Sequence, residues 1–262
     1  MTTSTDAPMS DSQTLVRPRT QPASALNPAA GDHAVTADPL EIAAAERAIR
    51  RSWAEFPYYA RRFGARGRSF SSSDSGWLVT LTTMTDDGAR AQALWLGTVL
   101  SARGMPRWML EHHLELLADE LTHARPEDAA RYERLRACAR ALRDRRQAHV
   151  DETTFVELER AFDARVPAAE QRRLRRMGGI LVAAVADERD GVELAVPSVV
   201  SWATDPARFG DDWIARSTRP SPRRASGRAE RLPGRARHRQ PLVPERARVG
   251  ARVRGHALAA AA

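Results

Sequence analysis

The sequence LEHHLELLADELTH, residues 110–123, repeats leucine every three or four positions and decides the fold class. At about 100° per residue, four leucines share one face of a helix: Leu110, Leu114, Leu117 and Leu121. Two of the acidic residues, Glu111 and Glu115, face the opposite side. The stretch therefore predicts an amphipathic helix that is buried along its leucines.

The same stretch contains three histidines that do not share a face. His113 lies beside the leucines, whereas His112 and His123 lie further round the helix. One inward histidine on a leucine-rich helix is the minimum that an axial haem ligand requires, so His113 is a candidate cofactor-binding residue. A histidine at the edge of a core, hydrogen-bonded to a neighbour, is the commoner arrangement and the preferred interpretation.

Glu120 and His123 form a Glu-x-x-His pair, which is the spacing found in carboxylate-bridged di-metal bundles. Such sites need a second pair of this kind and two further carboxylates from other helices. The sequence contains no second Glu-x-x-His pair. Glu120 and His123 therefore remain candidate metal ligands with no visible partners.

Apolar faces with helical spacing recur on both sides of this stretch. Asp38 followed by Pro39 predicts a helix start, with Glu41 completing a capping box. Residues 67–84, GRSFSSSDSGWLVTLTTM, could form a strand, but the spacing of their large apolar residues favours a helix. The next two helices are expected to begin at Pro106 and at Pro126.

A second helical group follows the first after residue 150. Its second segment contains Gly178 and Gly179, which weaken a helix unless a neighbouring backbone packs closely against them, and the sequence leaves both possibilities open. The whole pattern predicts an all-α protein, a bundle of about seven to nine helices joined by short turns.

The predicted organisation has four parts. Residues 1–37 are rich in Ser, Thr, Ala, Pro and Asp and lack apolar periodicity, so they are expected to be disordered. Residues 38–150 form the bundle, and residues 151–216 form the second group packed on it, as one domain or two. Residues 217–262, rich in Arg, Pro, Gly and Ala, are expected to be a disordered tail.

The tail also carries the charge of the protein. The 262 residues have a net charge of +8, and the segment after Thr218 holds 12 Arg against two Glu. Arginine segments bind nucleic acid through its phosphates, which makes nucleic-acid binding by the tail one functional alternative. The tail lacks aromatic residues for base stacking, and its composition is also typical of GC-rich DNA read out of frame.

The cellular location is expected to be the cytoplasm. The sequence contains no apolar run of about 18 residues that could span a membrane, and its first residues do not form a secretory signal. The single cysteine, Cys138, cannot form an intramolecular disulfide and fits a reducing compartment.

Sequence signatures of enzymes are missing. There is no phosphate-binding glycine loop, dinucleotide fingerprint, Gly-x-Ser-x-Gly elbow or His-Glu-x-x-His motif. The run SSSDSG, residues 71–76, superficially resembles a serine nucleophile site, but it lies where a helix cap is expected. The protein is therefore predicted not to be an enzyme.

The run ALWLGTVLSARGMPRWMLEHHLELLADEL, residues 93–121, resembles helical modules of uncharacterised bacterial regulators, some of which accompany cobalamin-binding domains. Its most specific element is the ARGMP turn. The resemblance implies a regulatory or interaction module. It does not extend to cobalamin, because the Asp-x-His-x-x-Gly ligand loop of such domains is missing.

The predicted function is a non-enzymatic regulatory or protein-interaction module that would bind an unknown protein partner through an apolar groove between helices. The two alternatives are a haem or metal sensor that uses His113 and a nucleic-acid binder that uses the tail.

Overall fold

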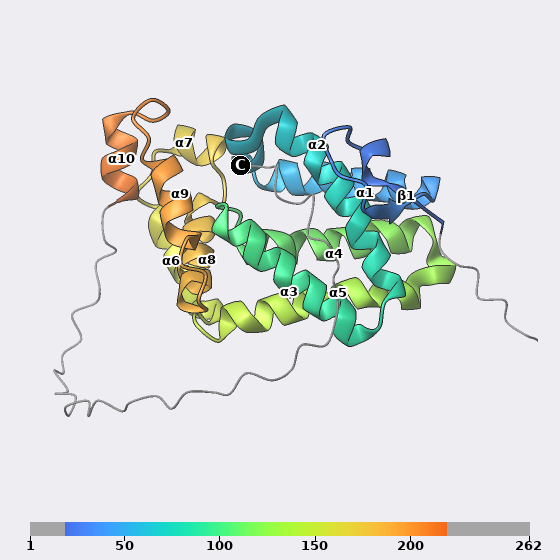
Figure 1. Ribbon diagram of the computed structural model, residues 1–262. Coiled ribbons are helices and arrows are strands. Elements are labelled where there is room, and N and C mark those ends of the chain that lie inside the picture. Colours follow the sequence, from blue (N-terminus) through green and yellow to red (C-terminus); the bar gives the residue numbers. More distant parts are fainter. Residues whose placement is uncertain (1–18, 219–262) are drawn as a thin grey trace, which may run out of the picture.

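A computed structural model describes residues 19–218, which fold into helices joined by short turns (Figure 1). A hairpin of β1 (Thr20–Pro22) and β2 (Ala34–Thr36) precedes ten α-helices in this part of the chain: α1 (Pro39–Glu55), α2 (Tyr58–Thr80), α3 (Asp86–Ala102), α4 (Arg107–Ala124), α5 (Ala129–Gln147), α6 (Glu152–Asp163), α7 (Ala168–Arg173), α8 (Met177–Arg189), α9 (Ala195–Ala203) and α10 (Asp211–Ser217). The predicted all-α class is confirmed.

Helix α4, which contains the leucine stretch, is the centre of the first five helices and packs mainly against α1 and α5. It begins after Pro106, as predicted, and Asp187 of α8 accepts a 2.8 Å hydrogen bond from the amide of Arg107 at its first turn. Glu111 does not face solvent. It is buried and pairs with the equally buried Arg146, 3.2 Å away on α5. The helix is therefore covered on its acidic side as well as along its leucines.

Helix α1 begins where the sequence predicts, with the carboxylate of Asp38 accepting hydrogen bonds of 2.8 and 3.3 Å from two amides of the first turn. The prediction that Glu41 completes a capping box is wrong. The side chain of Glu41 is buried and accepts hydrogen bonds from Thr36 at 2.5 Å and Tyr132 at 3.0 Å, and it pairs with Arg131. Glu41 therefore joins the hairpin and α5 to α1 instead of closing the end of its own helix.

The predicted disorder is wrong for residues 19–37. The two strands pair in antiparallel register, and Ala23 and Val35 are completely buried. The hairpin packs on α2 at Gly76, where an added Cβ would lie 2.8 Å from Leu26 and 3.2 Å from Val35. Strands of three residues are too short to show an alternation of apolar and polar residues, so the contact could not be predicted from the sequence.

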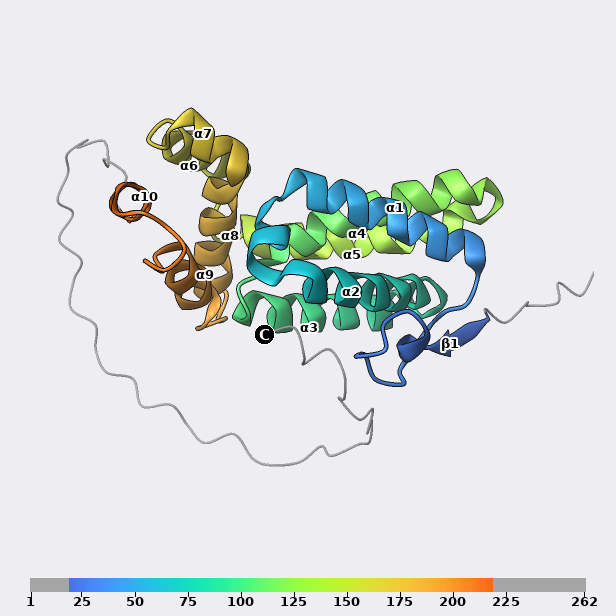
Figure 2. The same cartoon turned by 90° about the horizontal axis from the view of Figure 1, so that it is seen from above.

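The ambiguous run 67–84 is helical through Thr80, as the spacing favoured, and a 3₁₀ turn, Leu81–Thr83, follows it. Helix α2 bends at Gly64, whose φ of +56° is one that glycine adopts without a Cβ penalty. Beyond this bend, α2 runs beside α1 and turns one face toward α3 and α4 (Figure 2).

Helices α6–α10 form the second group at one end of the bundle, while the hairpin lies near the other end (Figures 1 and 2). The group is joined to the bundle by a continuous apolar cluster, to which Phe56, Tyr58 and Trp108 contribute from the first five helices. Trp108 packs against Phe155 of α6 with ring centroids 4.9 Å apart.

The two glycines of α8 lie where neighbours come close. A Cβ on Gly178 would lie 3.0 Å from the backbone oxygen of Glu159, and one on Gly179 would lie 2.6 Å from the ring of Trp108. Close packing against α6 and α4 therefore explains both glycines, the possibility that the sequence left open.

Cys138 is buried in the core of the bundle, as expected for a small core residue. None of the helices in residues 19–218 combines the length and apolar character needed to cross a membrane. The predictions for residues 1–18 and for the arginine-rich segment from Arg219, including nucleic-acid binding, lie outside the described residues.

Candidate ligand-binding cavity

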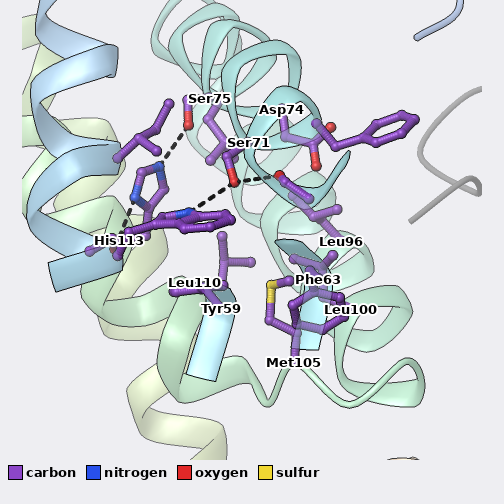
Figure 3. Close-up of a pocket in the computed structure, with 16 residues that line it drawn as sticks. Tyr59, Phe63, Ser71, Asp74, Ser75, Leu96, Leu100, Met105, Leu110 and His113 are labelled. Atoms are coloured by element: carbon purple, nitrogen blue, oxygen red, sulfur yellow. Dashed lines mark hydrogen bonds between the residues drawn. The ribbon is translucent and has the colours of Figure 1, made fainter. Parts of the chain in front are cut away.

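A cavity of about 60 Å³ lies inside the bundle between α1, α2, α3 and α4 (Figure 3). Sixteen residues line it, most of them apolar or aromatic: Ile49, Ser52, Trp53, Tyr59, Phe63, Gly67, Phe70, Ser71, Asp74, Ser75, Leu78, Leu96, Leu100, Met105, Leu110 and His113. It is called the His113 cavity below. Its polar groups come from one face of α2, from Ser52 and Trp53 on α1, and from His113 on α4.

His113 is the polar centre of the cavity. Its Nε2 lies 2.8 Å from Ser75 Oγ and its Nδ1 lies 3.3 Å from Ser52 Oγ, so hydroxyl groups satisfy both ring nitrogens (Figure 3). Burial, and to a smaller extent the charge of the nearby His112, lowers the pKa of His113 to about 4. The imidazole is therefore neutral at physiological pH, with one donor and one acceptor nitrogen.

Asp74 is the only acid among the residues that line the His113 cavity. Its Oδ1 is buried and has no hydrogen-bond donor within the part of the chain that the structure describes. Burial raises the pKa of Asp74 to about 7, although the charge of Arg103 opposes this shift. Near neutral pH the cavity thus contains a carboxyl group that is about half protonated.

The wall next to Asp74 is held by hydrogen bonds and ring contacts. The Trp53 indole donates to Ser71 Oγ at 3.2 Å, and Ser71 donates to the carbonyl oxygen of Gly67 at 3.0 Å. The rings of Trp53 and Tyr59 stack with centroids 5.5 Å apart. These contacts fix the side chains between which a ligand would lie.

The run SSSDSG is not a helix cap, because it lies in the middle of α2. Ser71 and Ser75 are four residues apart, so they lie on the same face as Phe70 and Leu78. A serine pair at this spacing among apolar residues was the signal that could have revealed the cavity. The predicted helix cap explained these serines by hydrogen bonds within their own segment, and so gave no reason to expect a cavity.

The Ser75–His113 hydrogen bond resembles the serine–histidine contact of a catalytic triad, but the carboxylate that completes such a triad is missing. Ser52 occupies the position next to Nδ1 where a catalytic histidine has a carboxylate, and a hydroxyl stabilises an imidazolium far less. The lowered pKa of His113 also makes it a weak base. The arrangement is suited to binding a neutral polar group rather than to acyl transfer.

The His113 cavity does not fit haem. Both ring nitrogens of His113 already have hydroxyl partners, and a cavity of about 60 Å³ is much smaller than a porphyrin. The imidazole therefore offers no open coordination position in this arrangement.

The structure does not assemble a metal site around Glu120 and His123. Glu120 is paired with Arg47 at 2.7 Å and with Arg51 at 2.9 Å, while His123 is exposed. Among residues 19–218 there is no group of three or more His, Cys, Asp or Glu side chains that could hold a metal ion. The carboxylate of Glu120 instead joins α4 to α1.

Comparison of the chain with protein-family models, curated proteins and solved structures found no match. The assignment of function therefore depends on the cavity and the residues that line it.

Proposed function

We propose that this chain is a non-enzymatic regulatory domain that binds a small, mainly apolar molecule in the His113 cavity. The ligand would place its apolar part among the leucine and aromatic side chains of the cavity. Ligand sites of this kind typically combine an apolar lining with a few fixed polar groups.

The observation that carries the proposal is the unfilled space beside a buried polar cluster. Interiors are normally packed to the density of organic crystals, and a hollow lowers stability. Here the hollow adjoins Asp74 Oδ1, which has no hydrogen-bond donor in the described part of the chain, and the neutral His113. A bound molecule would fill the space and restore van der Waals contacts on its walls.

The regulatory part of the proposal is supported by the resemblance of residues 93–121 to modules of bacterial regulators. It is also supported by the position of the cavity, because four helices meet there. A ligand that binds one arrangement of these helices better than another would shift the population toward that arrangement.

A protein-docking groove is a weaker alternative. The large exposed apolar side chains of the described residues are Leu40, Trp95, Val185 and Leu194. They come from four separate places: α1, α3, α8 and the turn before α9. Single exposed apolar residues are normal on soluble domains and do not define an interface.

Small apolar probes test the proposal. Xenon and 1-butanol should bind the protein and shift the nuclear magnetic resonance signals of residues that line the cavity, beginning with the Trp53 indole N–H. Leu100→Phe should fill the cavity and abolish the shifts. Leu116→Phe is the matched control, because Leu116 is 8% exposed, close to the 9% of Leu100, and does not line the cavity.

Binding that survives in Leu100→Phe, or that disappears equally in the folded control, would contradict the proposal. Melting temperatures of both variants show whether a lost signal reflects a filled cavity or an unfolded protein.

A further inference from the structure

A larger groove of about 510 Å³ adjoins the His113 cavity. Its lining comes from α2, from the end of α3 and the turn that follows, and from α9: Arg62, Phe63, Arg66, Gly67, Ala102, Arg103, Ser198 and Trp202. It is called the arginine groove below. Phe63 and Gly67 line both hollows, so the groove and the cavity lie side by side.

The arginine groove is strongly positive. Three of its eight lining residues are arginines and none is acidic. The side chain of Arg62 is fixed, because its two Nη atoms donate to Tyr58 Oη, to Ser198 Oγ and to the carbonyl oxygens of Ser198 and Arg103, over distances of 2.6–3.0 Å.

All these acceptors are neutral, so they satisfy the hydrogen-bond donors of Arg62 without balancing its charge. Within residues 19–218, neither Arg62 nor Arg66 forms an ion pair with a carboxylate. By contrast, Arg47 and Arg107 both pair with acids. Two positive charges at the groove therefore lack a counter-ion in the described part of the protein, and an anion would supply it.

Arg66 also marks the boundary between the two hollows. Its guanidinium carbon lies 5.8 Å from the ring centre of Phe70, which lines the His113 cavity. The charge thus lies beside the cavity wall rather than at a remote surface.

We propose that the cavity and the groove form one site for a short-chain carboxylate, whose apolar end enters the His113 cavity and whose carboxylate lies among the arginines. This inference rests on the proposed function and specifies its ligand. A dry apolar cavity of about 150 Å³ holds benzene, so about 60 Å³ holds two or three carbon atoms. Butanoate, with three carbons beyond its carboxylate, matches that length.

The protonation state of Asp74 determines the pH at which a carboxylate probe should be tested. At about pH 6 most Asp74 carboxyl groups are protonated, because burial raises their pKa to about 7, so the acid in the cavity lining does not repel the probe. The other titratable groups of the lining remain neutral, since burial lowers the pKa of His113 to about 4 and raises the pKa of Tyr59.

The experiment compares butanoate with 1-butanol, which has a chain of similar length and no charge. Each probe is titrated into the protein at about pH 6, and binding is followed from the indole N–H signals of Trp53, in the cavity lining, and Trp202, in the groove lining. Butanoate should bind more tightly than 1-butanol and should shift both signals.

Arg66→Gln should weaken butanoate binding about two- to fivefold, the range expected for one exposed charge, and leave 1-butanol binding unchanged. Arg90→Gln is the matched control, because it removes an exposed arginine near the other end of α3. Melting temperatures of the two variants should equal that of the wild type.

Four results would overturn the inference. If 1-butanol binds and butanoate does not, or if Arg66→Gln weakens both probes equally, the cavity takes a neutral ligand and only the anion assignment fails. If Arg90→Gln weakens butanoate as much as Arg66→Gln does, the effect is one of net charge rather than of the groove. If neither probe binds, the proposed function fails as well.

Discussion

Acidification should change the stability of the protein through two cavity groups that act in opposite directions. Burial lowers the pKa of His113 from 6.5 to about 4. As the pH falls below 6.5, the unfolded chain takes up a proton that the folded protein does not, so the folded state loses stability until the pH reaches about 4. At about 1.4 kcal/mol per pH unit, this loss amounts to about 3 kcal/mol.

Asp74 has the opposite effect. Burial raises its pKa from 3.8 to about 7. As the pH falls below about 7, the folded protein binds a proton that the unfolded chain does not yet bind, so folding becomes more favourable, by about 4 kcal/mol when the pH reaches 3.8. In the wild type the two effects largely cancel, so single variants are needed to separate them.

Urea unfolding of wild type, His113→Gln and Asp74→Asn at several pH values between about 4 and 7.5 measures each effect. The free energy of unfolding of wild type minus that of His113→Gln should fall by about 3 kcal/mol as the pH drops through this range, because all other titrating groups contribute equally to both proteins. The corresponding difference for Asp74→Asn should rise by about 4 kcal/mol.

Near pH 7.5 the His113→Gln exchange itself should cost about 1–2 kcal/mol, since it disturbs hydrogen bonds to two serines. A difference between wild type and His113→Gln that stays constant with pH would show that the folded protein protonates His113 normally. That result would refute the reading of the cavity as a desolvated polar centre.

Three further predictions concern the fold. Deleting residues 1–37 should lower the urea midpoint, and Val35→Ala alone should cost about 2 kcal/mol, because Val35 is fully buried; an unchanged midpoint for both would contradict docking of the hairpin. Asp187→Ala should cost about 2–4 kcal/mol in urea unfolding, since it leaves the buried Ser101 hydroxyl and the Arg107 backbone amide without their acceptor; a cost below about 1 kcal/mol would show that water replaces the carboxylate. Gly178→Ala should lower the melting temperature although alanine favours helices, and by more than Gly210→Ala, which changes the N-cap of α10 but whose added Cβ meets nothing within 4 Å; equal effects would refute close packing at α8.

The helices could be predicted because their apolar spacing is local information. Asp38 and Pro106 mark helix starts in the sequence and in the structure alike. The hairpin could not be predicted, since its stability comes from contacts with α2 that are remote in the sequence. Glu41 illustrates the same limit: three residues after a capping aspartate it has a standard local role, yet Thr36 and Tyr132 satisfy it instead.

The candidate site was predicted in part. The position of His113 beside the leucines correctly indicated a side chain directed toward the interior. Its partners Ser52 and Ser75 lie 61 and 38 residues away and could be identified only once the helices were packed. For Glu120 the local pattern was misleading. Its spacing from His123 suggested a metal ligand, whereas ion pairs with two arginines of α1 give it a structural role.

The His113 cavity is hard to explain by stability alone. At about 24 cal/mol per Å³, a cavity of about 60 Å³ costs between 1 and 2 kcal/mol. A deprotonated Asp74 adds a further penalty above its pKa of about 7. Domains are stable by only about 5–15 kcal/mol, so these costs are substantial. An apolar side chain in place of Ser71 or Asp74 would fill the space and remove the penalty. A bundle that keeps the hollow, its three serine hydroxyls and its acid is therefore better explained as a binding site than as a packing fault.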